Sequence, residues 1–143
     1  MDNTLSSVES FIRDYARNIS AGNGAALLAQ FADPFLAAMP QGAKVVSVAE
    51  HAKALPGRRE FFERSGFRST SLVSLHPIPL SSRYTLALTK WSMTFAVAQG
   101  APREILLDSA LIVDTGVDPF KIILYLAAED LATVLKDNGI MEG

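Results

Sequence analysis

The sequence predicts an α+β fold in which helices come first and an antiparallel sheet follows. Two observations support this prediction. In most of the chain up to Gly66, apolar residues recur every three or four positions, which is typical of helices with one buried face. From residue 69 onward, apolar residues alternate with polar ones or form short runs between turn residues, which is typical of strands. Helices that precede the strands, rather than alternating with them, favour α+β over a parallel α/β sheet.

The first helix is predicted from a stripe of apolar residues with a spacing of three or four. The stripe consists of Leu5, Val8, Ile12, Tyr15 and Ile19. Ser6 and Glu9 have the spacing of a capping box, and Gly22 is a suitable residue for the end of the helix.

A second helix is predicted to begin at the N-cap residue Asn23 and to carry apolar residues as far as Phe31. Pro34 is expected to end it, because the residue before a proline avoids helical backbone angles. The segments "FLAAM" and "AKVVSV" then flank "PQG", and this order predicts a small β-hairpin.

A third helix is predicted to follow the hairpin. Ser47 and Glu50 form a second capping-box pattern at its start. The helix is expected to be interrupted, or at least stressed, at Pro56 and Gly57, and Gly66 is expected to end it.

Four strands are predicted to form an antiparallel meander over residues 69–78, 83–97, 103–113 and 120–128. Turn residues separate the later strands, as in "QGAP" and "DTGVDP". A short helix from Asp130 to about Lys136 is expected to close the chain, with Asn138 and Gly139 at its C-terminal end. Without a linker or an internal repeat, residues 1–143 are predicted to form one domain.

The composition excludes several classes of function. The 143 residues are 49% hydrophobic and 20% charged with a net charge of -2, so no strong field attracts nucleic acid or an acidic membrane. The chain has no cysteine, and its two histidines are far apart in sequence, so neither a thiolate site nor a metal site is expected. No cofactor motif is present, so no cofactor is expected.

The N-terminus lacks the features of a signal peptide and no apolar run is long enough to cross a membrane, so a cytoplasmic protein is expected.

Three segments resemble the nuclear transport factor 2-like family, which includes the SnoaL-like cyclases and the ketosteroid isomerases. "DYARNISAGNGAALLAQFAD" is similar to the family's opening helix pair, "GRREFFERSG" to its third helix and "FKIILYLAAEDL" to its last strand. The resemblance covers most of the chain. It implies a cone in which a curved sheet wraps around the N-terminal helices and leaves an apolar pocket at the open end, and it implies a homodimer.

The resemblance also implies positions for site residues. Ketosteroid isomerases use a helix tyrosine and a strand aspartic acid as oxyanion donors, and a second aspartate as general base. The tyrosine corresponds to Tyr15 and the strand aspartic acid to Asp108, whereas the base position falls on Met39. A thioether accepts no proton near neutral pH, so isomerase activity of the ketosteroid type is not expected.

The residues themselves leave two readings of this pair open. Tyr15 lies on the apolar stripe of its helix, and the neighbours of Asp108 on its own face of the strand are Leu106 and Ala110. If that face is inward, the carboxyl group must be hydrogen-bonded, paired or protonated, and a Tyr15–Asp108 pair would satisfy both groups. Alternatively, the pair is only structural, or Asp108 faces solvent.

Three functions follow as hypotheses. The first is a pocket that binds a small apolar or aromatic molecule with one carbonyl or phenol-like oxygen. Tyr15 and Asp108 would hold the oxygen, and the wall would be formed by Phe35, Met39, Trp91 and Tyr125. The second is an isomerase, cyclase or dehydratase with a relocated base, for which His76 is the candidate, since His51 is expected to be solvated. The third is a non-catalytic dimerisation or interaction module whose cone is filled by side chains.

Overall fold

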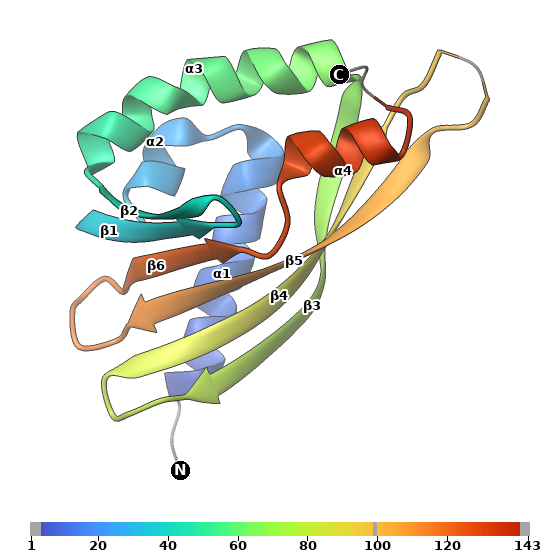
Figure 1. Cartoon of the computed structure of the whole chain (residues 1–143). Coiled ribbons are helices and arrows are strands. Elements are labelled where there is room, and N and C mark those ends of the chain that lie inside the picture. The colour runs from blue at the N-terminus through green and yellow to red at the C-terminus, as the bar shows by residue number, and fades with distance from the viewer. Residues whose placement is uncertain (1–3, 99, 141–143) are drawn as a thin grey trace.

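The computed structural model describes residues 4–98 and 100–140 and shows four helices and six strands within them. The helices are α1 (Thr4–Ala21), α2 (Gly24–Leu28), α3 (Val48–Ser65) and α4 (Leu131–Asp137). The strands are β1 (Phe31–Met39), β2 (Gly42–Val46), β3 (Phe67–Pro79), β4 (Tyr84–Phe95), β5 (Arg103–Asp114) and β6 (Lys121–Ala127). The α+β class and the order of helices before a meander are confirmed (Figure 1).

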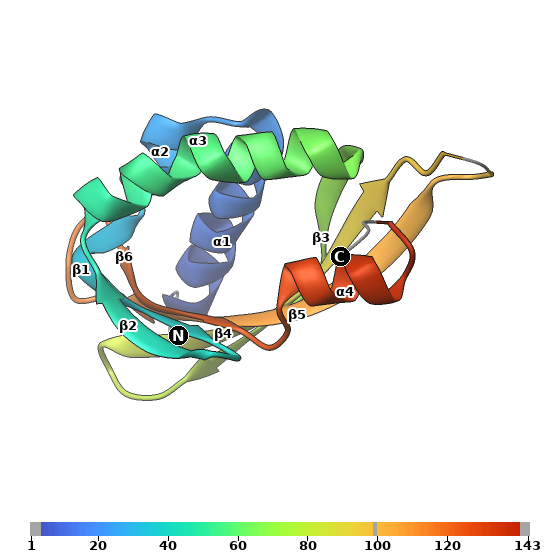
Figure 2. The same ribbon diagram turned by 45° about the horizontal axis from the view of Figure 1, so that its top comes forward.

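All six strands belong to one curved sheet with the order β2-β1-β6-β5-β4-β3. The predicted meander corresponds to β3 through β6, and the predicted hairpin to β1 and β2. The hairpin joins the meander through a parallel pairing of β1 with β6, in which Ala37 lies opposite Tyr125. This pairing was not predicted. Helices α1, α2 and α3 lie on the same side of the sheet, and α1 lies between α3 and the strands (Figure 2).

Most helix ends follow the predicted local chemistry. The Asn23 side chain accepts a hydrogen bond from the amide of Ala26 at the start of α2. Ser47 and Glu50 form both hydrogen bonds of a capping box at the start of α3. Gly66 ends α3 in the left-handed conformation with φ 81°, and Asp130 caps α4. The first predicted capping box is wrong, because Ser6 lies inside α1.

The predicted extension of the second helix to Pro34 is also wrong. Helix α2 ends at Leu28, and Phe31 already begins a strand. The reason is tertiary, since the amide of Ile122 in β6 donates a hydrogen bond to the carbonyl of Gln30 and starts the parallel pairing there. Pro34 lies where the β1–β6 register is irregular, a position at which the missing N–H of proline is tolerated.

The predicted interruption of the third helix is wrong as well. Helix α3 runs without a break from Val48 to Ser65 and contains Pro56 in its interior. Pro56 and Gly57 are both exposed, so water can reach the backbone that the proline leaves without its usual hydrogen bond.

Two hydrophobic clusters hold the helices on the sheet. The larger one joins α1, β1 and the central strands through buried residues that include Ile12, Tyr15, Trp91 and Leu111. The smaller one lies under α4 and consists of Met93, Phe95, Ile105 and Leu135, with Phe62 and Phe67 packed against it. Within the described residues, no helix has the length and apolar character needed to cross a lipid bilayer.

Candidate functional site

The inner face of the sheet and the helices above it enclose a group of five rings, which we call the inner aromatic cluster. It consists of Tyr15, Phe31, Phe35, His51 and Trp91. The Tyr15 ring centre lies 6.0 Å from those of Phe31 and Trp91, and the His51 ring centre lies 5.0 Å from that of Phe31. Edge-to-face contacts of this kind position rings firmly. The cluster thus brings residues of α1, β1, α3 and β4 to one place.

Tyr15 supplies a buried hydroxyl group to this cluster. The residue is 6% exposed, as its place on the apolar stripe predicted. Burial raises the pKa of Tyr15, nearby Tyr125 raises it further and the guanidinium of Arg58 opposes the rise. The hydroxyl group therefore stays protonated at neutral pH, and no described residue forms a hydrogen bond with it.

His51 supplies a second polar atom, and here the prediction of a solvated side chain is wrong. Its ring packs against Phe31 and Phe35, and its Nε2 atom is buried without a hydrogen-bond partner among the described residues. Burial, followed by the charge of Arg58, lowers the pKa of His51, so its imidazole is neutral at neutral pH. A signal for this placement exists in the sequence, because residues 51, 55, 58 and 62 have the spacing of one helix face.

Trp91 faces Tyr15 across the cluster, which fixes the face of β4 that the sequence left open. Its Nε1 atom donates to the hydroxyl oxygens of Thr89 and Ser109, each at 3.0 Å. The Thr89 and Ser109 hydroxyl groups are themselves 2.6 Å apart, and Thr89 also donates to the carbonyl of Ser109. These polar groups satisfy one another, so they serve to position the Trp91 ring.

Asp108 does not join Tyr15, and the predicted oxyanion pair is wrong. Its side chain is 61% exposed and lies 3.3 Å from the ammonium nitrogen of Lys90. The two residues are opposite each other in the β4–β5 register, on the outer face of the sheet. The inward position beside it belongs to Ser109, because successive side chains of a strand point to opposite faces.

His76 is also on the outer face, so its proposed role as a relocated base is wrong. It is exposed and lies opposite Leu88, which is 41% exposed. A side chain in this position has no route to the inner aromatic cluster.

The other predicted wall residues lie along the inner face of β1 and β6. Phe35 is buried within the cluster, and Ala37 on the same face lies opposite Tyr125. Met39 lies farther along, at the tip of the hairpin, where it is 43% exposed. A hollow of about 370 Å³ at this tip is lined by Ala37, Met39, Gln41, Gly42, Ala43 and Lys44. Tyr125 lies opposite Ala37 in the β1–β6 pairing and is not among the residues that line this hollow.

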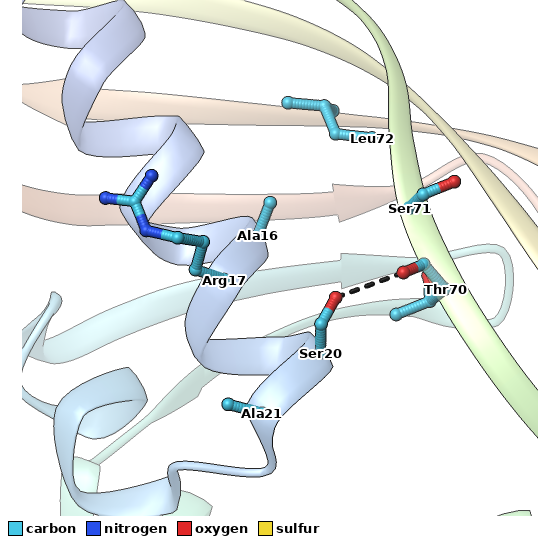
Figure 3. A pocket seen from close by; sticks show the side chains of 7 residues that line it. All are labelled: Ala16, Arg17, Ser20, Ala21, Thr70, Ser71 and Leu72. Carbon is cyan, nitrogen blue, oxygen red and sulfur yellow. Dashed lines mark hydrogen bonds between the residues drawn. The ribbon is translucent and has the colours of Figure 1, made fainter.

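A second hollow, of about 540 Å³, lies between α1 and β3 (Figure 3). Its lining includes Ala16, Arg17 and Leu72, and the Ser20 hydroxyl group donates to the carbonyl of Thr70 at 3.0 Å across it. Arg17 forms an ion pair with Asp14. Neither of these two hollows is lined by a ring of the inner aromatic cluster.

Comparisons with known proteins show similarity in structure alone. No family model and no curated protein matches the sequence. A ketosteroid isomerase-like protein from Erwinia carotovora superposes with a TM-score of 0.70 at 13% identity, over 88% of this chain and 95% of its own. The protein Aln2 from a Streptomyces species gives a TM-score of 0.71 at 10% identity, over 94% and 96%. A nuclear transport factor 2 superfamily protein from Salmonella enterica gives 0.63 at 13% identity, over 90% and 93%. The chain therefore has the nuclear transport factor 2-like fold that its sequence resembles.

Proposed function

We propose that the protein binds a compact aromatic molecule carrying a hydroxyl or carbonyl oxygen, and that this molecule occupies the inner aromatic cluster. The observation that carries the proposal is the His51 Nε2 atom, which is buried without a hydrogen-bond partner among the described residues. The Tyr15 hydroxyl group beside it also forms no hydrogen bond with a described residue. Leaving a buried group such as His51 Nε2 unsatisfied costs about 1–3 kcal/mol. A ligand oxygen supplies the missing hydrogen bonds, and the surrounding rings supply apolar contact.

The hollow at the hairpin tip is the proposed entrance. It lies on the face of β1 that also carries Phe35, and Met39 forms part of its rim. Ala37 lines this hollow, lies opposite Tyr125 and is two residues from Phe35 on the same strand. In this proposal, a ligand that enters at the hollow passes Tyr125 before it reaches the cluster. The flexible thioether of Met39 suits such an entrance, since it adapts to different apolar shapes.

A second candidate is catalysis of an isomerase, cyclase or dehydratase type, with His51 in place of His76 as the base. The specific observation in its favour is the lowered pKa of His51, which leaves a neutral imidazole able to take a proton. Tyr15, which stays protonated, would donate to the ligand oxygen. Binding is common to both candidates and is tested first.

We expect 2-naphthol to bind the native protein and to bind the Tyr15→Phe variant about 3- to 10-fold more weakly, because one neutral hydrogen bond contributes about 0.5–1.5 kcal/mol. Isothermal titration calorimetry measures both affinities. The substitution removes no hydrogen bond within the described residues, so the thermal stability of the variant should match that of the native protein.

Tyr84→Phe is the matched control, because Tyr84 lies at the start of β4, where its ring contacts Arg83. It should leave the affinity unchanged. Absence of binding to the native protein would remove the proposal and favour the interaction module.

We further propose that the outer face of the sheet mediates homodimerisation. Three large apolar side chains on it are strongly exposed: Leu88 (41%), Leu106 (50%) and Leu126 (39%). Leu88 and Leu126 both lie opposite Ala110, so they form one continuous row across three strands. Apolar patches of this kind on a sheet usually mark a protein interface.

We expect sedimentation analysis to show a dimer for the native protein and a monomer for Leu88→Glu, because a buried carboxylate opposes association. Leu80→Glu is the control, since Leu80 is 53% exposed but lies in the turn between β3 and β4. A native protein that stays monomeric at high concentration would contradict this assignment.

A further inference from the structure

We infer that the ligand of the inner aromatic cluster is an aromatic acid and that Arg58 binds its carboxylate. The inference rests on the proposed function and names the chemical class of the molecule. It is based on the position of Arg58, on the absence of an acidic partner for it among the described residues, and on the length of α3 between Arg58 and His51.

Arg58 lies on the same face of α3 as His51. The two positions are seven residues apart, which corresponds to two helical turns. The guanidinium carbon of Arg58 is 5.0 Å from the ring centre of Phe62, one turn farther along this face. Phe62 in turn packs against the smaller hydrophobic cluster. This contact holds the guanidinium group beside the interior although the side chain remains accessible to water.

No carboxylate pairs with Arg58 within residues 4–98 and 100–140. Two acidic side chains of α3 and of the segment before α4 have other roles. Glu50 completes the capping box of α3, and Asp130 caps α4 while it also interacts with Gln41. At the entrance, Lys44 adds a second positive side chain that forms no ion pair in the described structure. Arg58 and Lys44 are therefore two cationic side chains without an ion-pair partner within the described residues.

The positive charge of Arg58 influences the pKa of both Tyr15 and His51. Burial raises the pKa of Tyr15, and the charge of Arg58 opposes this rise. Burial lowers the pKa of His51, and the charge of Arg58 lowers it further. A positive field that disfavours a second cation at His51 favours an anion in the same place. Arginine is well suited to this role, because its planar guanidinium group donates two parallel hydrogen bonds to a carboxylate.

The distance along α3 suggests the length of the acid. Seven residues of helix rise about 10 Å between the Cα atoms of His51 and Arg58, which is about the length of a two-ring aromatic molecule. In this arrangement the carboxylate lies at Arg58, the rings lie among Phe31, Phe35 and Trp91, and an oxygen at the far end lies near Tyr15 and His51.

The test compares 2-naphthoate with 2-naphthol, which share the same ring system and differ in charge at neutral pH. We expect the native protein to bind 2-naphthoate at least about tenfold more tightly than 2-naphthol, measured by calorimetry at low salt. Arg58→Gln should remove this preference, because it should weaken naphthoate binding about tenfold more than it weakens naphthol binding.

Arg59→Gln is the matched control, because Arg59 is the exposed neighbour of Arg58 and changes the net charge by the same amount. Retention of the preference in Arg59→Gln together with its loss in Arg58→Gln supports the inference. Equal affinities of the native protein for the two probes would overturn it while leaving the proposed function intact. Failure of both probes to bind would remove the proposed function itself.

Discussion

Replacing Phe95 with alanine should lower the free energy of unfolding by about 3–5 kcal/mol. Phe95 is fully buried between the sheet and α4, where its ring centre lies 5.7 Å from that of Phe67. Its removal leaves a cavity that the fully buried Leu135 of α4 cannot fill without moving the helix. Urea unfolding, followed by circular dichroism, measures the change.

The matched control for this effect is Leu80→Ala, because Leu80 is apolar but 53% exposed. It should change the free energy of unfolding by no more than about 0.5 kcal/mol, as is usual for surface substitutions. Phe95→Leu should recover most of the stability that alanine loses, since most of the apolar volume is restored. A loss below about 1 kcal/mol for Phe95→Ala would mean that α4 does not pack on the sheet as described.

Replacing Gly66 with alanine should also destabilise the protein strongly, for two separate reasons. Gly66 has φ 81°, and a side chain in the left-handed region costs about 1–2 kcal/mol. In addition, a Cβ atom at this position would lie 2.7 Å from the carbonyl oxygen of Ala96. That oxygen belongs to the backbone, and the amide of Ala96 donates a 2.8 Å hydrogen bond to the carbonyl of Gly66. Neither of these two backbone segments can therefore easily move away from the other.

Gly22→Ala separates the two reasons. Gly22 follows α1 with φ 67°, but a Cβ atom there would meet nothing within 4 Å. It should therefore cost only the conformational part, about 1–2 kcal/mol, and Gly66→Ala should cost clearly more. If urea unfolding gave equal decreases in the free energy of unfolding for the two variants, the close approach of Gly66 to Ala96 would not contribute to the cost of a side chain at Gly66.

Features that depend on neighbouring residues were predicted well from the sequence. The ends of α2, α3 and α4 rest on hydrogen bonds between residues three or four positions apart, as with Ser47 and Glu50 or with Asp130 and Thr133. Such pairs can be recognised without knowledge of the rest of the fold. The strands of the meander were predicted for the same reason, since each has its own pattern of apolar residues and turns.

Features that depend on distant segments were not predicted. Phe31 fits the spacing of the preceding helix, yet pairing with Ile122 places it in a strand. Tertiary hydrogen bonds of this kind override a local preference, and no pattern of nearby residues reveals them.

The errors in the candidate site have a common geometric origin. Asp108 and Ser109 differ by one position in β5, and a difference of one position exchanges the inner and outer faces of a strand. His51 was assigned to solvent because its sequence neighbours are polar, although its neighbours on the helix face are Leu55, Arg58 and Phe62. The burial of Tyr15 was predicted correctly because its stripe has five members, which together define the buried face of the helix.

The parallel pairing of β1 with β6 means that the order of synthesis and the order of assembly differ in this protein. Strand β1 (Phe31–Met39) is made well before its partner β6 (Lys121–Ala127), because β2, α3, β3, β4 and β5 lie between them in the sequence. Until β6 has left the ribosome, the hairpin of β1 and β2 has no other strand beside it, and a lone two-stranded hairpin has little stability of its own. The edge of the hairpin that later becomes internal is thus open to other chains throughout translation. Completion of the sheet must wait until β6 has been made, and the long loop that this contact closes makes folding slower than the local helices alone would allow.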